Sequence, residues 1–408
     1  MMALSSMTTN QIKRNIAVVT ATRAEYGLLS RLIRLLEDHP DFDLQLYVTG
    51  GHLSDEQGYT VETIRQDGHL ITEEIPILSH KKDADTELAI SQTTAKALEG
   101  FAEAFAKHRP HAVFVLGDRY ELLGICSAAL LANIPIFHLH GGEVTEGAVD
   151  DAIRHAVTKM ASLHFVAAEP YRQRVIQMGE QPVTVFNVGA PGLDVIQQIQ
   201  MLSLKELEAF LEMSLSSPLF LVTYHPVSWG ETQGEQALEN LFQAFEALSI
   251  DYPNMSVIWT AANTDVGGHE LNNRIQQWVV ETEINAEFVT SLGSQRYLSL
   301  MKLCDVVVGN SSSGVIEAPA QGVPTVNIGE RQKGRLMADS IIQSEESTET
   351  IVLSIKNALN KDRSQITSIY GQGNTAKSIV EILEKTDFNQ LLPKRFFDIS
   401  FSLDNLPE

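Results

Sequence analysis

Residues 138–155, with the sequence HLHGGEVTEGAVDDAIRH, contain three histidines, four carboxylates and one arginine. So many titratable groups fit a metal site, a site for acid/base catalysis or the solvated first turn of a helix. His138 and His140 would share one face of a strand, as an H-x-H metal pair does. The usual partners, a third histidine and a bridging carboxylate at later strand ends, are not evident. A histidine like His138 is more often a hydrogen-bonded core residue.

The second half of this stretch holds the carboxylates. The glycines at 141–142 let the backbone approach a ligand closely. Glu143 and Asp150 then flank the start of an expected helix that carries Arg154 and His155. Asp150 is equally suited to cap that helix. Taken alone, the stretch indicates an acid/base site about as strongly as a capped helix.

Asp118 follows the apolar sequence VFVLG, and Arg119 comes next. A carboxylate at the end of a buried strand is partly removed from water. Partial desolvation raises the pKa of a carboxyl group and suits it to act as a base. The alternative for Asp118 is a structural anchor for the helix that follows.

The sequence GNSSSG at 309–314 joins an apolar strand to a helix. Free N–H groups at the helix start, together with the hydroxyls of Ser311, Ser312 and Ser313, suit a phosphate. The plainer interpretation is a serine helix cap. Glu317, one turn later, is placed either to accept from ribose hydroxyls or to interact with the helix dipole.

The net charge of −22 makes nucleic acid and anionic membranes poor partners, because both need a basic surface. An anionic small molecule requires the few cations to gather in one cleft. The sequence GERQKGR supplies Arg331 and Lys333 at a predicted strand end, which favours a ligand role. Arg23, His225 and Asn263 stand at other strand ends.

Short β-branched runs alternate with amphipathic segments along most of the chain, which predicts parallel sheets covered by helices on both faces. We expect strands at 15–22, 42–50, 111–118, 135–142 and 219–226, among others. We expect helices at 27–40, 86–110, 121–134 and 374–385, among others. The predicted fold class is therefore α/β, with doubly wound, Rossmann-like sheets.

A chain of 408 residues is too long for one hydrophobic core, so we expect two domains. The predicted boundaries are 1–187, 188–373 and a C-terminal part, 374–408, that packs back on the first domain. Ligands of such sheets bind beyond the carboxyl ends of the strands, so we expect one cleft between the domains. Two apolar-flanked cysteines, no signal peptide and no apolar run of about 20 residues predict a cytoplasmic protein.

Several long motifs together resemble the hydrolysing UDP-N-acetylglucosamine 2-epimerases. They are TRAEYGLL, VTGGHLS, VLGDRYELL, HGGEVTEGAVDDAIRHAVTK, FNVGAPG, GNSSSGVIEAP and IGERQKGR. The resemblance implies the GT-B architecture of two Rossmann-like domains. It also implies N-acetylmannosamine synthesis for bacterial sialic acid, with no nicotinamide and no metal. Family members commonly form dimers or tetramers, so a homo-oligomer is expected.

The resemblance also implies roles for individual residues. The proposed reaction removes the C2 proton while UDP leaves from C1, and water then adds to the resulting glycal. The implied catalytic residues are Asp118, Glu143, Asp150 and His225. The implied or positional substrate-binding residues are Arg23, Arg119, His140, Arg154, His155, Asn263, Ser311, Ser312, Ser313, Gly314, Glu317, Arg331 and Lys333.

One departure from the family pattern concerns the second acid/base group. Some members have H-x-E-G-G-E, and the first glutamate of that pattern is His140 here. Either Glu143, which is retained, takes over the role, or His140 acts as an imidazole. We prefer Glu143.

Other functions remain open. The nearest alternative is the same chemistry on UDP-2,4-diacetamido-2,4,6-trideoxyglucose, since the sequence does not separate the two sugars. A GT-B glycosyltransferase would share the fold but need an acceptor. A non-catalytic UDP-sugar sensor would turn nothing over, and a metal hydrolase using His138 and His140 would lose activity on chelation.

Overall fold

The structure is a computed structural model that describes residues 13–55, 58–78, 86–144, 149–225, 233–262 and 268–400. The chain divides into two compact units, Met1–Asp194 with Asn374–Glu408, and Val195–Gly373. In the described residues, no helix is both long and apolar enough to cross a membrane.

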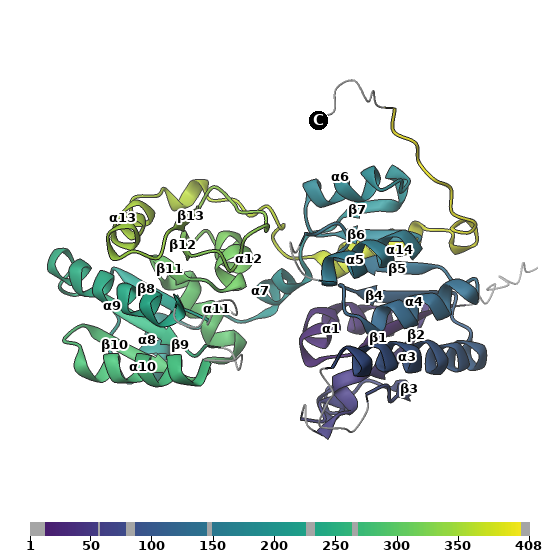
Figure 1. Cartoon of the computed structure of the whole chain (residues 1–408), viewed down its shortest axis with the longest axis horizontal. Helices are drawn as coiled ribbons and strands as arrows, with labels where there is room; N and C mark the ends of the chain where they lie inside the picture. The colour runs from purple at the N-terminus through teal and green to yellow at the C-terminus, as the bar shows by residue number, and fades with distance from the viewer. Residues whose placement is uncertain are drawn as a thin grey trace, which may run out of the picture. The chain divides into compact units, whose positions relative to one another are not determined.

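The first unit contains a seven-stranded parallel sheet in the order β3-β2-β1-β4-β5-β6-β7 (Figure 1). Most of its strand residues are buried on both faces, as the apolar runs in the sequence predict. The strands are β1 (Arg14–Thr20), β2 (Phe42–Thr49), β3 (Ile71–Ile75), β4 (Ala112–Leu116), β5 (Ile136–Leu139), β6 (Leu163–Val166) and β7 (Val185–Asn187).

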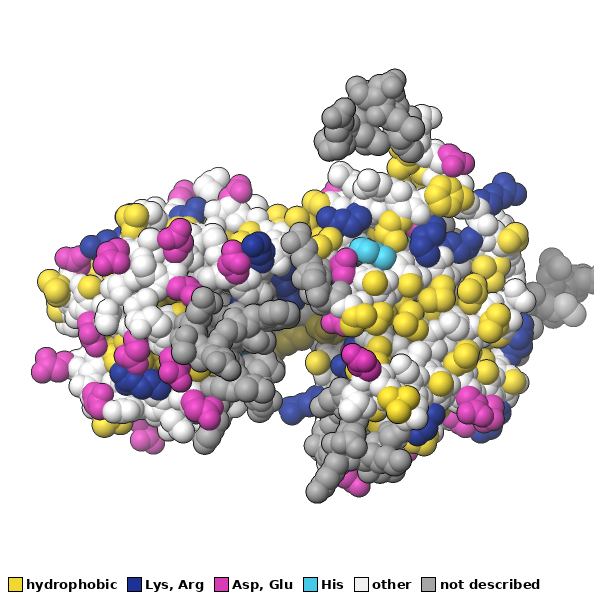
Figure 2. All heavy atoms as spheres, viewed as in Figure 1, with side chains coloured by type: hydrophobic (Ala, Val, Ile, Leu, Met, Phe, Trp, Pro, Cys, Tyr) yellow, Lys and Arg dark blue, Asp and Glu magenta, His cyan; other side chains and the backbone are white. Residues whose placement is uncertain are grey.

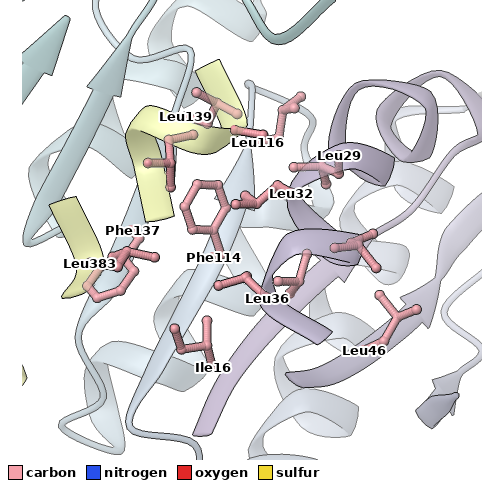
Figure 3. Packing of buried hydrophobic residues seen from close by; sticks show 14 of the residues in the cluster. Ile16, Leu29, Leu32, Leu36, Leu46, Phe114, Leu116, Phe137, Leu139 and Leu383 are labelled. Carbon is pink, nitrogen blue, oxygen red and sulfur yellow. The ribbon is translucent and has the colours of Figure 1, made fainter. Parts of the chain in front are cut away.

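Helices cover both faces of this sheet. They are α1 (Arg23–Glu37), α2 (Val61–Gln66), α3 (Glu87–His108), α4 (Glu121–Leu131), α5 (Val149–Met160), α6 (Glu169–Gln177) and α14 (Thr375–Lys385). Ile16 and Val18 point into the core under α1, α2 and α14, part of which Figure 3 shows. Ala17 and Val19 point into the opposite core, under α3, α4 and α5, because neighbouring strand residues face opposite sides.

The C-terminal helix α14 belongs to the first unit because its apolar face packs in the core against α1. The Asp194 carboxylate caps its start by accepting hydrogen bonds from the backbone N–H groups of Asn374, Thr375 and Ala376 at 2.8, 2.7 and 2.8 Å. Arg14, at the start of β1, donates to the carbonyl oxygens near the end of the same helix. Both ends of α14 are therefore held.

The second unit contains a six-stranded parallel sheet in the order β10-β9-β8-β11-β12-β13. Its strands are β8 (Leu219–Thr223), β9 (Ser256–Thr260), β10 (Asn285–Val289), β11 (Val306–Gly309), β12 (Thr325–Ile328) and β13 (Ile341–Ser344). Its helices are α8 (Leu204–Leu211), α9 (Gln233–Asp251), α10 (Gly268–Glu281), α11 (Gly293–Leu303), α12 (Ser312–Ala320) and α13 (Thr348–Leu359), while α7 (Asp194–Gln198) leads into the unit.

Each sheet has a point where the strand order reverses. In the first unit it lies between β1 and β4, and in the second between β8 and β11. At such a point the connections on either side diverge to opposite faces of the sheet, which leaves a crevice at the carboxyl ends of the strands. Each unit is thus doubly wound, as the sequence predicts, and most of the candidate residues follow the strands at or beside these points.

Candidate active site

The loop after β4 brings Asp118 against helix α5. Its carboxylate forms an ion pair with the guanidinium of Arg154, which also lies 3.4 Å from Asp151. Arg154 is almost fully buried, so its charge is compensated by these two acids rather than by bulk water. The structure therefore brings Asp118 close to Asp151, in the first turn of α5.

The loop after β5 holds Glu143, the candidate for the second acid/base group. His140, at the end of β5, has a φ of 67°, a conformation uncommon for residues other than glycine. Its Nδ1 is paired with the carboxylate of Glu143. Gly142 admits no larger residue, because a Cβ there would lie 2.5 Å from the carbonyl oxygen of Tyr171. Arg174 donates to the Gly142 carbonyl oxygen, so helix α6 fixes the backbone just before Glu143.

His138 does not belong to this group of residues. It is fully buried, its Nε2 lies 2.8 Å from the Gly117 carbonyl oxygen, and its Nδ1 lies 3.2 Å from the Thr158 hydroxyl. Burial lowers the pKa of His138 to about 3. With both ring nitrogens bonded inside the protein, His138 is a core histidine.

The first turn of α1 adds charged groups at the same edge of the sheet. The helix begins at Arg23, four residues earlier than the expected start, so Arg23 is exposed on its first turn and Glu25 is buried. Burial raises the pKa of Glu25 to about 7, although the Ala21 N–H donates to it at 2.7 Å. Arg119 lies between Glu25, at 3.8 Å, and Glu121, at 2.6 Å.

Helix α5 does not direct all its polar groups to one place. Asp150 is exposed in the first turn, and His155 lies 3.5 Å from Asp151. Lys159, near the other end of the helix, instead pairs with Glu180 at 2.6 Å. The polar groups of α5 that lie near Asp118 therefore come from the first half of the helix.

In the second unit, Gly309 and Asn310, at the end of β11, lie against the end of the neighbouring strand β8. Gly309 has a φ of 130°, and a Cβ there would lie 2.0 Å from the Thr223 carbonyl oxygen. The buried Asn310 side chain accepts from the His225 N–H at 2.7 Å and donates to the His225 carbonyl oxygen at 2.9 Å. Asn310 therefore fixes the backbone of His225 beside the serine loop.

The serine loop caps helix α12 and forms a chain of hydroxyls. Ser311 is the N-cap, and its hydroxyl accepts from the Ser313 N–H. The Ser313 hydroxyl lies 3.0 Å from that of Ser311 and 2.5 Å from the phenol oxygen of Tyr297, on α11. Gly314 packs against β12, where Thr325 donates to its carbonyl oxygen. These contacts leave the first turn of α12 lined with hydroxyls, an arrangement that suits a phosphate.

Glu317 lies one turn further along α12. Its Oε2 is buried and, among the described residues, has no hydrogen-bond partner. Burial raises the pKa of Glu317 to about 7. A buried polar atom without a partner costs stability unless a ligand or water satisfies it. Glu317 is thus ready to accept a hydrogen bond from a ligand.

The loop after β12 contributes Arg331, which donates to the Asn310 carbonyl oxygen at 3.2 Å, as does Gln332 at 2.8 Å. Lys333 is exposed and pairs with Glu330, three residues earlier in the chain, at 3.1 Å. Arg331 therefore lies at the serine loop, whereas Lys333 faces solvent. Asn263 lies outside the described residues.

No group of three or more histidine, cysteine, aspartate or glutamate side chains placed to hold a metal ion occurs among the described residues. The polar groups of the first unit instead include the carboxylates of Asp118 and Glu143, which are paired with Arg154 and His140. Those of the second unit include the hydroxyls of the serine loop and the Glu317 carboxylate, whose Oε2 has no hydrogen-bond partner in the part of the chain that the structure describes. The first set suits proton transfer and the second suits a ribose diphosphate.

The model of a family described as UDP-N-acetylglucosamine 2-epimerase matches residues 34–384. The chain belongs to this family. A Campylobacter jejuni relative named GDP/UDP-N,N'-diacetylbacillosamine 2-epimerase (hydrolyzing) is 41% identical over 333 residues, which cover 82% of this chain and 85% of the relative. A Legionella pneumophila relative named UDP-N,N'-diacetylbacillosamine 2-epimerase (hydrolyzing) is 35% identical and covers 91% of this chain and 96% of its own.

A solved structure supports the fold of this epimerase family member. The UDP-GlcNAc 2-epimerase from Neisseria meningitidis, bound to UDP-GlcNAc, superposes with a TM-score of 0.72 at 19% identity, covering 91% of this chain and all of that one. The predicted family and GT-B fold are therefore confirmed.

Two residues of the candidate site were not predicted from the sequence. Asn310 lies inside the GNSSSG motif, so the motif itself could have indicated a role for it. The sequence does not show that its side chain bonds to the backbone of His225. Tyr297 belongs to no motif, and only the packing of α11 against α12 brings it to Ser313.

Proposed function

We propose that this enzyme is a hydrolysing 2-epimerase that acts on a UDP-linked 2,4-diacetamido-2,4,6-trideoxyglucose, also called N,N'-diacetylbacillosamine. The products are the corresponding manno sugar and UDP. The main support for this substrate is the 41% identity to a relative named for that sugar. UDP-N-acetylglucosamine, the first expectation from sequence, has less support than this alternative.

The first unit supplies the proton chemistry. Asp118 is the base that takes the proton from C2, and the C1–O bond to UDP breaks as the C1=C2 bond of the glycal forms. Water then adds its oxygen to C1 and a proton to C2 on the other face. Glu143, paired with His140, and Asp150 are the candidates for guiding this water and its proton.

The second unit binds UDP. The hydroxyls of Ser311 and Ser313 and the first turn of α12 receive the diphosphate. Glu317 accepts from the ribose hydroxyls, which satisfies its buried Oε2. Arg331, beside this loop, and His225, held by Asn310, stabilise the charge of the leaving diphosphate.

The test compares UDP release from the two sugars under identical conditions, with EDTA present. We expect kcat/KM to be at least about tenfold higher for the diacetamido sugar, because a site that binds an acetamido NH rejects an analogue without it. A higher kcat/KM for UDP-N-acetylglucosamine would restore the first expectation. Transfer to an acceptor without free sugar would instead indicate a glycosyltransferase.

The nucleotide is tested with the GDP-linked sugar, because the Campylobacter relative is named for both nucleotides. We expect UDP to be preferred. A GDP-linked sugar turned over more efficiently would contradict the uridine part of the proposal and leave the sugar part intact.

A further inference from the structure

Tyr297 makes a contact that the proposed chemistry does not use. Its phenol oxygen lies 2.5 Å from the hydroxyl of Ser313, and Ser313 lies 3.0 Å from the hydroxyl of Ser311. The three hydroxyls form a chain that joins α11 to the cap of α12, and the phenol of Tyr297 also hydrogen-bonds to the side chain of Thr223, at the end of β8. The ring of Tyr297 packs against the hydrophobic core that includes Leu300 and Met301, and this packing restrains the position of the phenol.

The order of donors in this chain matters for an anion. Phosphate oxygens at neutral pH accept hydrogen bonds, so a serine that binds them must donate its one proton outward. A serine that has already given its proton to a neighbouring hydroxyl offers the anion only a lone pair. The binding form of the loop is therefore the one in which another group donates to Ser313.

Tyr297 is the group that can fill this role. A phenol is more acidic than an aliphatic hydroxyl and is the better donor of the two. Burial raises the pKa of Tyr297 to about 12, so the phenol keeps its proton throughout the physiological range. Donation from Tyr297 to Ser313 leaves the Ser313 proton available to a phosphate oxygen.

We propose that Tyr297 is a positioning residue of the nucleotide site, which orients the Ser313 hydroxyl toward the diphosphate. This inference rests on the proposed function, because it assumes that the serine loop binds UDP. Tyr297 acts through Ser313 and touches no reacting atom. Its loss should weaken the binding of UDP and the substrate and leave the chemical step nearly unchanged.

The test is a double-mutant cycle on UDP affinity, measured by calorimetry with Tyr297→Phe, Ser313→Ala and the double variant. We expect Tyr297→Phe to raise the Kd for UDP by about tenfold, since one hydrogen bond to a charged group is affected. In the Ser313→Ala background, the same change should alter the Kd by less than about twofold, because the hydroxyl it orients is gone. In turnover, KM should rise and kcat should stay within about twofold.

The matched control is Tyr47→Phe, which removes another buried phenol hydroxyl, bonded to Gln45 at 3.0 Å in the first unit. Its UDP affinity should equal that of the wild type. A second variant carries trifluorotyrosine at position 297, which keeps the ring and hydroxyl but ionises at lower pH. Relative to the wild type at the same pH, its UDP affinity should fall as the pH rises, because a phenolate cannot donate.

The outcomes separate the two claims. A wild-type enzyme that does not bind UDP overturns the proposed function and this inference with it. A wild-type enzyme that binds UDP while Tyr297→Phe binds equally well overturns the inference alone. So does an equal loss on the wild-type and Ser313→Ala backgrounds, because Tyr297 would then act independently of the hydroxyl.

Discussion

Asp118 and Asp151 both contact Arg154, yet only Asp118 is assigned as the base. Asp118→Asn should lower kcat by about 10²–10⁴-fold, because the amide cannot take the C2 proton. UDP affinity should change little, because we propose that the second unit binds the nucleotide. The measurement is steady-state release of UDP, with UDP affinity determined by calorimetry.

Asp151→Asn is the matched control, since it removes the other acid beside the same guanidinium. A base at position 118 predicts a much smaller loss for this variant. Equal losses would assign the effect to compensation of the Arg154 charge and refute the role of Asp118 as base.

Glu317 predicts a proton linkage of UDP binding. In the free enzyme, burial raises the pKa of Glu317 to about 7, so the carboxyl is largely protonated below that pH. Ribose hydroxyls that donate to Glu317 favour its charged form and lower this pKa. UDP binding should therefore release protons and become tighter as the pH rises from about 5 to about 7.

The linkage is measured by calorimetry in two buffers that differ in ionisation enthalpy. Glu317→Gln is the control, because it keeps the shape and removes the titration, so any release from UDP itself remains. An identical proton release by the two proteins would show that Glu317 does not meet the ligand.

The sequence predicted which residues end the strands but not how their side chains pair. Asp118 and the serine loop are visible because apolar strands run directly into them. The pairing of Asp118 with Arg154 depends on the rotation of α5, and that of Ser313 with Tyr297 on the packing of α11. Such contacts are set by tertiary packing, which the local pattern does not contain.

At the scale of elements, the junction of β11 and β8 requires a glycine. In Gly309→Ala, the added Cβ would lie 2.0 Å from the Thr223 carbonyl oxygen, and alanine would have to adopt the positive φ of Gly309. Both the steric clash and the backbone strain destabilise the folded protein. We expect the free energy of unfolding to fall by about 3 kcal/mol or more. Urea unfolding of the full chain measures it.

Gly27→Ala is the opposite case. Gly27 lies within α1, is exposed, and has no atom within 4 Å of an added Cβ. Alanine should stabilise the protein by about 1 kcal/mol through its higher helix propensity. A destabilisation by Gly309→Ala no larger than the effect at Gly27 would contradict the steric account of the junction.

The central strands and their helices could be predicted because buried parallel strands appear as apolar runs. The edge strands β3 and β13 could not. β3, with the sequence ITEEI, is mostly only partly buried, and β13 was not assigned either. Edge strands need fewer apolar residues since one side has no neighbour. The early start of α1 depends on capping by Thr22, whose hydroxyl accepts from the Glu25 N–H.

At the scale of the whole molecule, the chain leaves the first unit after Asp194 and returns at Asn374. Asp194 joins these two points, because its carboxylate accepts from three N–H groups at the start of α14. Asp194→Ala would leave these donors buried and unpaired. We expect the free energy of unfolding to fall by about 3 kcal/mol, measured by urea unfolding.

The control is Asp362→Ala, which removes an exposed aspartate that accepts from the Ser364 N–H at 3.0 Å within one turn. Its effect should stay below about 1 kcal/mol. Equal effects of the two substitutions would mean that Asp194 is an ordinary surface cap.

Association of subunits stays a prediction from the family resemblance. Figure 2 shows hydrophobic side chains gathered over the α3 and α4 region of the first unit. Leu130 and Leu131, at the end of α4, are exposed. Large exposed apolar patches often mark surfaces of interaction, and sedimentation of the purified protein would measure the oligomeric state.

The central claim is that the enzyme breaks the C2–H bond of a UDP-sugar and then hydrolyses the glycal. The most direct measurement follows the UDP-diacetamido sugar by NMR in deuterated water with EDTA present. The account predicts UDP and a free manno sugar that carries deuterium at C2. A product that keeps its original hydrogen at C2, or a free sugar with gluco configuration, would contradict it.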